Sequence, residues 1–385
     1  MGERRSKGAG DGALLLGALR SPALLPELAP DAWDRLLRLA RRARLLGRLH
    51  AVLSASGDLG RIPGRAANHL VAAGNLARHR QTLVTWELNR VLWALDGVDA
   101  PVIALKGAAY VLAGLPPAPG RLFADLDVLV PESRIRDVEG ALLARGWYQK
   151  RLDPYDEHYY REWMHEIPPL RHRERETEVD IHHALLPRTS LLRADPARLI
   201  EAARPLPNKA VKVLAPPDMV LHALLHLLLE GDPQEGLRLR DLLDVHDLLG
   251  HFGRDEPGFW EALPRRAREL GLMRILYYGL RHANRLLGTD IPDGVLRETA
   301  SGAPSLPVRS LMDRLVPLAI LPEVGRPGPR VAAARWLIYM RAHWLRMPPW
   351  LLARHLSYKA WLQMGARRGR ARPAPRPQDP AKQRP

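Results

Sequence analysis

Apolar positions along this chain follow a helical spacing over most of its length and a strand-like spacing in the middle. Between residues 31 and 54, and again between 65 and 95, they recur every three or four positions, which predicts helices. At residues 101–105 a short continuous apolar run predicts a buried strand instead. Residues 122–130 contain a second strand pattern. The middle of the chain is therefore expected to hold a sheet between helical parts.

Further short elements complete this central region. Helices are predicted at residues 108–115 and 132–145. The remaining apolar runs predict strands at 147–152, 158–173, 177–183 and 211–214. Helices and strands thus occur in mixed order, and the predicted fold class is α+β with a mixed sheet.

A Leu-rich helical periodicity returns at residue 216 and indicates a second, all-helical part. After residue 365 the chain is rich in Arg and Pro, a composition typical of disorder. The prediction is five segments: a flexible N-terminus (1–30), N-terminal helices (31–96), an α+β core (97–215), a helical domain (216–364) and a basic, disordered tail (365–385).

Charge and composition say little about which class of partner the protein binds. The formal net charge of +16 favours polyanions such as nucleic acid, nucleotides or an anionic membrane surface. An Arg-rich composition of the whole genome explains this charge at least as well. The absence of cysteine excludes a disulfide framework, thiolate metal sites and a catalytic thiol, and it is compatible with the predicted cytoplasmic location. No apolar run approaches the roughly 18 residues that a transmembrane helix needs.

The candidate chemistry lies in the second predicted strand. Asp125 and Asp127 are two positions apart, so both carboxylates point to the same face of a strand. Two carboxylates held this close repel each other unless a cation lies between them. Mg²⁺, with Mn²⁺ as an alternative, prefers oxygen ligands and leaves room for substrate phosphates. The pair therefore predicts a metal site.

A third carboxylate, Asp180, lies in the predicted strand 177–183. If this strand neighbours the first, three carboxylates converge, an arrangement suited to two-metal phosphoryl or nucleotidyl transfer. The third carboxylate can also accept the proton of an attacking hydroxyl. His182 is two residues further on and shares this face. It could contact substrate or a metal-bound water, or it could be a packed histidine, with about equal weight.

Lys106 and Gly107 follow the first predicted strand and precede a predicted helix. Glycine lets a backbone approach phosphate closely, and a helix N-terminus presents free N–H groups. Lys106 and Arg121 could add positive charge at the phosphates or at the leaving pyrophosphate. Each of these signals is weak alone, and a Lys-Gly pair is more often a plain turn.

In their order along the chain, these residues resemble the polymerase-β-like nucleotidyltransferase superfamily, and most closely its bacterial nucleotidyltransferase family proteins. The resemblance covers about residues 80–250. It rests on three short motifs: Leu105-Lys106-Gly107, Arg121 before Asp125-Leu126-Asp127-Val128-Leu129-Val130, and Val179-Asp180-Ile181-His182. The following helical part, with Asp218, His222, His226 and Arg240-Asp241, is also similar to that group.

The resemblance implies a nucleotidyltransferase core over residues 97–215 that moves a nucleoside monophosphate from an NTP such as ATP to a hydroxyl acceptor. It implies Asp125, Asp127 and Asp180 as catalytic, metal-binding residues. The residues implied to bind the nucleotide are Lys106, Gly107, Ala108, Arg121 and His182. Ala108 departs from the Gly or Ser that the superfamily has at this position, so no hydroxyl is available there, although the backbone N–H remains. The acceptor stays open between RNA, a protein and a small molecule.

Two other functions remain open. One is a catalytically silent scaffold with the same fold that binds nucleic acid or an anionic membrane through its basic C-terminus. Trp and Arg/Lys residues in segment 330–364 favour this, although amphipathic helices more often simply cover a core. The other is a metal-dependent glycosyltransferase, whose chemistry does not call for the Lys-Gly turn or the third Asp. His222 and His226 are expected to be structural or substrate-lining, and Asp241, Asp244 and Asp247 to form a charged, ion-paired helix face.

Overall fold

The computed structural model describes residues 2–123, 125–149, 153–175, 177–207, 209–348, 350–351 and 354, without the side chains of residues 2–9, 154 and 156. The basic tail predicted for residues 365–385, and residues 355–364 of the predicted helical domain, lie outside the described residues.

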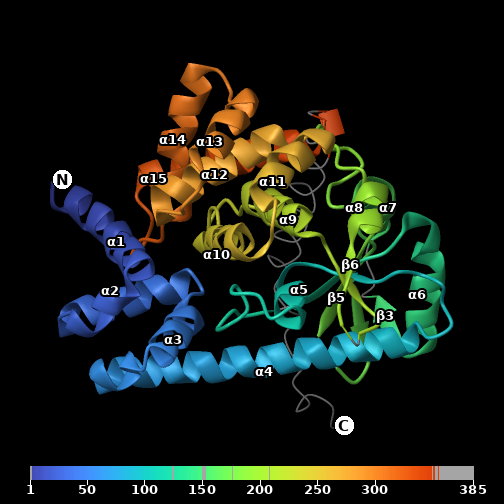
Figure 1. Ribbon diagram of the computed structural model, residues 1–385, viewed down its shortest axis with the longest axis horizontal. Helices are drawn as coiled ribbons and strands as arrows, with labels where there is room; N and C mark the ends of the chain where they lie inside the picture. The colour runs from blue at the N-terminus through green and yellow to red at the C-terminus, as the bar shows by residue number, and fades with distance from the viewer. Residues whose placement is uncertain are drawn as a thin grey trace, which may run out of the picture.

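The N-terminal part is helical. Its elements are α1 (Gly2–Arg20), η1 (Pro22–Glu27), α2 (Pro30–Arg42), α3 (Leu46–Ala55), η2 (Asp58–Arg61) and α4 (Gly64–Ala94). The long α4 runs beneath the rest of the molecule in Figure 1. The expectation of a flexible start is wrong for the part of 1–30 around Leu15 and Leu25, because both side chains are buried in the core.

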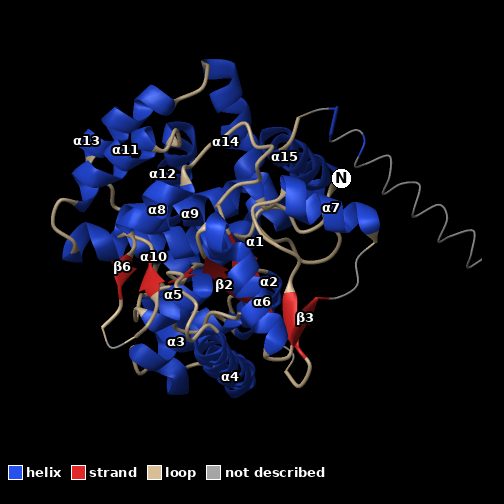
Figure 2. Ribbon diagram, turned by 90° about the vertical axis from the view of Figure 1, so that its right-hand side faces the viewer, coloured by secondary structure: helices blue, strands red, loops and turns tan. Residues whose placement is uncertain are grey.

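A seven-stranded mixed sheet forms the centre, in the order β3-β4-β5-β2-β1-β7-β6. The strands are β1 (Ile103–Ala104), β2 (Asp125–Leu129), β3 (Trp147–Gln149), β4 (Leu170–His172), β5 (Glu178–His182), β6 (Arg204–Pro205) and β7 (Lys212–Val213). Figure 2 shows the strands enclosed by helices, with α4 on one side and α9 and α10 on the other. The fold class is α+β, as the sequence predicts.

The pairing of β2 with β5 brings two of the candidate carboxylates side by side. The two strands are parallel, and Asp127 lies directly beside Asp180 in the register. On its other side β2 pairs with β1, which leads into Lys106. The strands that carry the carboxylates are therefore neighbours, which the sequence left as a condition.

One predicted strand is wrong. Residues 158–173 do not form a single strand, because α7 spans Pro154–Trp163 and only β4 is extended. The many aromatic residues suggest a strand, but Tyr155, Tyr159 and Trp163 recur every four positions, which places them on one helix face. The rings of Tyr155 and Tyr159 lie 6.1 and 5.8 Å from that of Trp163.

Short helices cover the sheet, and a helical domain follows it. Around the sheet lie α5 (Lys106–Leu112), η3 (Glu132–Arg134), α6 (Ile135–Ala144) and α8 (Pro196–Ala202). The helical domain consists of α9 (Pro216–Leu229), α10 (Leu239–Asp255), α11 (Phe259–Glu269), α12 (Met273–Leu287), α13 (Asp293–Thr299), η4 (Ala300–Gly302), α14 (Leu306–Ile320) and α15 (Pro329–Arg346). Nearly every residue of α9 is buried, since α10, α11, α12 and α15 all pack against it. A single hydrophobic core runs from α1 through the sheet into this domain.

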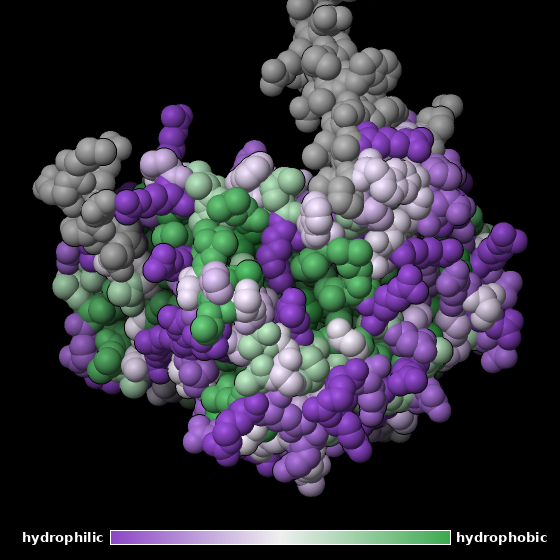
Figure 3. All heavy atoms as spheres, turned by 90° about the horizontal axis from the view of Figure 1, so that it is seen from above, coloured by the Kyte–Doolittle hydropathy of each residue, from purple (hydrophilic) through white to green (hydrophobic). Residues whose placement is uncertain are grey.

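The helix α15 packs by one face only. Val331, Ala334 and Ile338 are buried, whereas Trp336 and Trp344 on the other face are 54% exposed. Seen from above, apolar side chains gather toward the middle of the face, with polar side chains around them (Figure 3). Among the described residues, no helix combines the length and the apolar character needed to cross a membrane.

Candidate active site

The turn between β1 and α5 positions the first site residue, Lys106. The backbone N–H of Leu105 donates to the carbonyl of Asp127 at 3.0 Å, which ties the turn to β2. Lys106 has φ = 45°, a left-handed conformation that costs a non-glycine residue roughly 1–2 kcal/mol. Its ammonium Nζ lies 3.0 Å from Asp127 Oδ1. The ion pair helps to hold this strained backbone, and such strain is typical of functional turns.

Glycine is required at position 107 for a steric reason. A Cβ there would lie 2.0 Å from the ring of Phe123 and 2.8 Å from a guanidinium nitrogen of Arg121. Both Gly107 and the following Ala108 are buried. The segment before β2 can therefore pack directly on the turn only because residue 107 has no side chain.

Asp127 is the centre of the site. Its Oδ1 accepts from Lys106 Nζ and lies 3.0 Å from His182 Nε2. The other ring nitrogen of His182 is 3.4 Å from Glu166 Oε2. Burial alone would raise the pKa of Asp127, but the charge of Lys106 and the hydrogen bond from His182 outweigh it and hold that pKa well below its usual range. Asp127 is therefore ionised.

Asp180, beside it, has the opposite character. Its Oδ1 is buried and has no hydrogen-bond partner in the part of the chain that the structure describes. Burial, together with the charges of Asp127 and Glu166, raises the pKa of Asp180 to about 9. Asp125, at the start of β2, is exposed. The three carboxylates supply the oxygen ligands that a hard divalent cation prefers, but in this structure their oxygens do not all lie within 4.8 Å of one another.

Arg121 is placed differently from the expectation. Its Nε donates to Asp244 Oδ2 at 2.8 Å, and its guanidinium lies 5.6 and 5.2 Å from the ring centres of Tyr110 and Phe123. The Arg121 side chain is only 9% exposed. In this structure Arg121 joins the core to α10 of the helical domain, and its phosphate contact stays a prediction.

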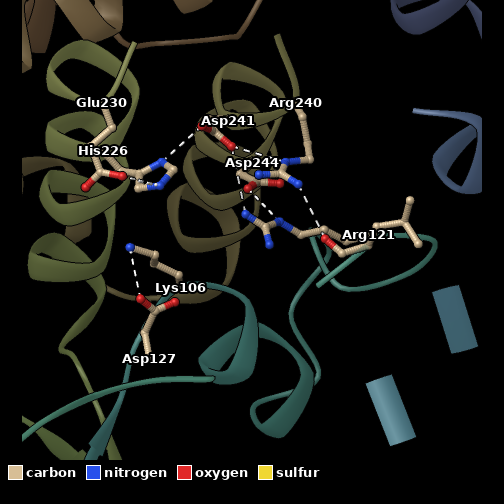
Figure 4. Close-up of polar contacts among 9 residues, drawn as sticks. Lys106, Arg121, Asp127, His226, Glu230, Arg240, Asp241 and Asp244 are labelled. Carbon is tan, nitrogen blue, oxygen red and sulfur yellow. Dashed lines mark hydrogen bonds and ion pairs between the residues drawn. The ribbon is translucent and has the colours of Figure 1, made fainter. Parts of the chain in front are cut away.

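The ion pairs between Arg121 and α10 extend to residues of α9 (Figure 4). His226 Nδ1 lies 3.0 Å from Asp241 Oδ2, and its Nε2 lies 2.9 Å from Glu230 Oε2. Burial alone would lower the pKa of His226, but the two carboxylates outweigh it and raise this pKa to about 9. Asp241 also accepts from Arg240 Nε at 3.2 Å. The ion pairs expected on this face of α10 are present, but Asp241 and Asp244 are buried rather than solvent-facing.

A pocket opens beside this network and above Lys106. Its polar lining consists of Lys106, His165, His182, His222, His226, Glu230 and Arg346. His165, Glu230 and the nearby Glu166 were not among the sequence candidates. They come from a loop after α7 and from the end of α9, and no motif connects them to the carboxylates. They are near the carboxylates only because of how the chain folds.

The predicted residues thus divide into three sets. Asp125, Asp127 and Asp180 lie on adjacent strands, with Asp127 beside Asp180. Lys106 and His182 join them through direct contacts with Asp127. The remaining three candidates, Gly107, Ala108 and Arg121, lie at the turn or behind it.

Comparison with known proteins identifies the family. No curated protein and no solved structure matches the chain. A family model described as an uncharacterised nucleotidyltransferase matches residues 29–288, from α2 to just after α12. The match spans the whole sheet, every residue of the site except Arg346, and more than half of the chain. The chain therefore belongs to this nucleotidyltransferase family.

Proposed function

We propose that this protein is a metal-dependent nucleotidyltransferase that transfers a nucleoside monophosphate from an NTP to a hydroxyl acceptor, with release of pyrophosphate. The observation that carries the proposal is the pairing of β2 with β5, in which Asp127 lies beside Asp180 and Asp125 is two positions earlier on the same strand. The buried Asp180 Oδ1, which has no partner among the described residues, supports a cation at this place.

Asp125, Asp127 and Asp180 would hold Mg²⁺, or Mn²⁺ in its place. The bound ions would neutralise charge on the triphosphate and lower the pKa of the attacking hydroxyl. Asp127 contributes as a carboxylate, because Lys106 and His182 keep it ionised. With Oδ1 engaged by these two donors, Oδ2 is the atom that it offers to a ligand.

Asp180 would accept the proton of the acceptor hydroxyl. Without a cation its pKa of about 9 leaves it protonated at neutral pH, so it can act as a base only when a bound cation keeps it ionised; its Oδ1 is not committed to another group among the described residues. A general base works best when its proton affinity approaches that of the group it deprotonates. We therefore assign the metal-binding role mainly to Asp125 and Asp127, and a double role to Asp180.

Lys106 would bind the phosphates from the edge of the pocket. Its side chain is 17% exposed and its ammonium already lies beside Asp127, so it can contact a phosphate and a metal ligand at once. Gly107 and Ala108 would add backbone N–H groups. Both ring nitrogens of His182 face carboxylates, so His182, the other candidate for nucleotide binding, would act through Asp127. Arg121 would have to open its ion pair with Asp244 to reach a phosphate, so we assign it chiefly to holding α10 in place.

The acceptor is left open by the chemistry of the site, because RNA, protein and small molecules all offer hydroxyl groups. A contact of the basic C-terminus with an anionic membrane or with nucleic acid likewise remains a proposal. It would matter for delivering the acceptor and not for the transfer step.

Isothermal titration calorimetry with each NTP tests the nucleotide site without knowledge of the acceptor. We expect binding that requires Mg²⁺ or Mn²⁺ and that falls at least tenfold in Asp125→Asn, whose residue faces solvent and can be changed without unfolding the core. Asp31→Asn, an exposed position at the start of α2, is the matched control and should bind normally. Metal-independent binding, or none, together with salt-dependent binding to RNA or anionic vesicles, would favour the scaffold function instead.

A further inference from the structure

A second group of potential metal ligands lies behind Asp127, and no carboxylate of the triad belongs to it. His165, Glu166 and His182 each offer a ligand atom, and these atoms all lie within 4.8 Å of one another. His165 and Glu166 come from the loop after α7, and His182 ends β5. The group mixes imidazole with carboxylate, a ligand set that suits Zn²⁺ and similar transition metals rather than Mg²⁺.

The backbone holds these ligands in place. Glu166 and His182 form an antiparallel bridge between the loop and the strand. The carbonyl of His165 accepts from the N–H groups of His183 and Ala184 at 2.9 and 3.3 Å. The loop is therefore fixed against the end of β5, and the ligand positions are set before any ion binds.

His182 has the hydrogen-bond pattern of a metal ligand. Its Nε2 is 3.0 Å from Asp127 Oδ1, which leaves Nδ1 as the coordinating atom. Metal-bound histidines almost always donate their other ring N–H to a carboxylate or carbonyl in this way. The distance from Nδ1 to Glu166 Oε2 is 3.4 Å, close to the roughly 3.3 Å that separates two ligands of a tetrahedral zinc ion with bonds of about 2.0–2.1 Å.

His165 supplies an independent observation. Its side chain is 8% exposed, and Nδ1 is buried without a hydrogen-bond partner among the residues that the structure describes. The ring centre lies 5.3 Å from that of His182. A buried imidazole nitrogen without a partner costs free energy, and coordination to a metal would remove this cost.

We propose that His165, Glu166 and His182 form a binding site for one Zn²⁺-like transition-metal ion, separate from the Asp125–Asp127–Asp180 site. Three protein ligands would leave one coordination position for water or substrate, and two of the three, His165 and His182, also line the pocket. The ion would orient the His182 N–H toward Asp127. His182 would then be a positioning residue that couples the two sites. The existence of this site does not depend on the proposed transfer reaction.

The experiment uses the full chain after removal of metals with a chelator. Calorimetry with ZnCl₂ and the visible spectrum after addition of CoCl₂ measure affinity and coordination, with or without a large excess of Mg²⁺. We expect one tight Zn²⁺ site that Mg²⁺ does not displace and a Co²⁺ spectrum typical of four-coordinate nitrogen and oxygen ligands. Glu166→Gln and His165→Ala should each lower the Zn²⁺ affinity at least about tenfold.

Two controls separate this site from the carboxylate triad. Asp125→Asn should keep the tight Zn²⁺ site, and His79→Ala, an exposed histidine on α4, should keep it as well. If His165→Ala does not fold, Glu166→Gln, which keeps the side-chain shape, still decides the question. The proposal is overturned if wild type lacks a tight Zn²⁺ site, if Mg²⁺ displaces the ion, or if Asp125→Asn abolishes the site while Glu166→Gln leaves it intact.

Discussion

At the scale of single residues, two neighbouring aspartates of the site differ in pKa because their surroundings differ. Asp127 has an ammonium and an imidazole at 3.0 Å, and its pKa is held low, whereas Asp180 has carboxylate neighbours and a pKa of about 9. Pairs of carboxyl groups whose environments push their pKa values apart are typical of sites that need both a permanent anion and a group that can carry a proton.

Replacing Asp180 by Asn tests this division. The substitution removes a carboxyl group that crowds Asp127 and Glu166, so we expect the metal-free protein to unfold with a free energy about 1–2 kcal/mol higher than wild type. Transfer activity should fall at least about 100-fold. Urea unfolding in the presence of a chelator, and a label-transfer assay, measure the two quantities. Loss of both stability and activity would mean that Asp180 is a structural residue.

The sequence predicts the carboxylates well, because the spacing of two in a strand requires nothing beyond local geometry. It cannot find Glu166, since this residue becomes a neighbour of His182 only when the loop after α7 folds back on β5. The role of Arg121 is missed for the same reason. Its partner Asp244 lies 123 positions further along the chain, and no local pattern connects them.

At the scale of elements, α9 and α10 are joined by buried charges. His226 on α9 lies between Glu230, the residue that follows this helix, and Asp241 on α10. Because its pKa is raised to about 9, the folded protein keeps a proton on His226 that the unfolded chain releases near pH 6.5. The stabilisation is complete below pH 6.5 and is lost as the pH rises through about 9.

We therefore expect the free energy of unfolding to decrease by an amount on the order of 3 kcal/mol between pH 6.5 and pH 9 through this residue. Denaturant unfolding across this range measures it. His226→Gln should lose most of that slope, whereas His79→Gln, on the exposed face of α4, should keep it. Equal slopes in wild type and His226→Gln would show that the histidine is not protonated in the fold.

The long helix α4 is anchored to the sheet by a buried carboxylate. Glu87 is fully buried and accepts from Trp147 Nε1 at 3.1 Å and from Arg175 Nε at 2.7 Å. Glu87→Ala leaves the partly buried guanidinium of Arg175 without its partner, so we expect a loss of about 3–5 kcal/mol of stability.

Thermal or denaturant unfolding checks this loss. The control Glu201→Ala, at an exposed position of α8, should change stability by less than about 0.5 kcal/mol. A cost below about 1 kcal/mol for Glu87→Ala would show that apolar packing alone holds α4 in place.

Element prediction from the sequence succeeds where one periodicity dominates, as in α2, α4 and the helices of the helical domain. It fails at α7, where Tyr and Trp residues have strand propensity but are spaced for a helix. The strands are short, two to five residues each, and their order in the sheet depends on long-range pairing. The parallel register of β2 and β5 arises from this long-range pairing, and no local pattern in either strand specifies it.

At the scale of the whole molecule, ion pairs join the helical domain to the segment before β2 and to the N-terminal helices. Arg121 joins the segment before β2 to Asp244 on α10, and Arg48 on α3 reaches Asp247 on the same helix at 2.8 Å. Three parts of the chain therefore meet at α10, next to the pocket above Lys106. We expect a rearrangement of this helix to change access to the pocket above Lys106.

The most direct test of the central claim compares two labelled forms of each NTP. The protein is incubated with Mg²⁺, cell lysate as a source of acceptors, and an NTP labelled either at the α- or at the γ-phosphorus. Nucleotidyl transfer predicts that label from the α-position becomes attached to an acceptor, that γ-label leaves as pyrophosphate, and that Asp127→Asn abolishes both. Attachment of the γ-label, or unchanged labelling by Asp127→Asn, would contradict the account.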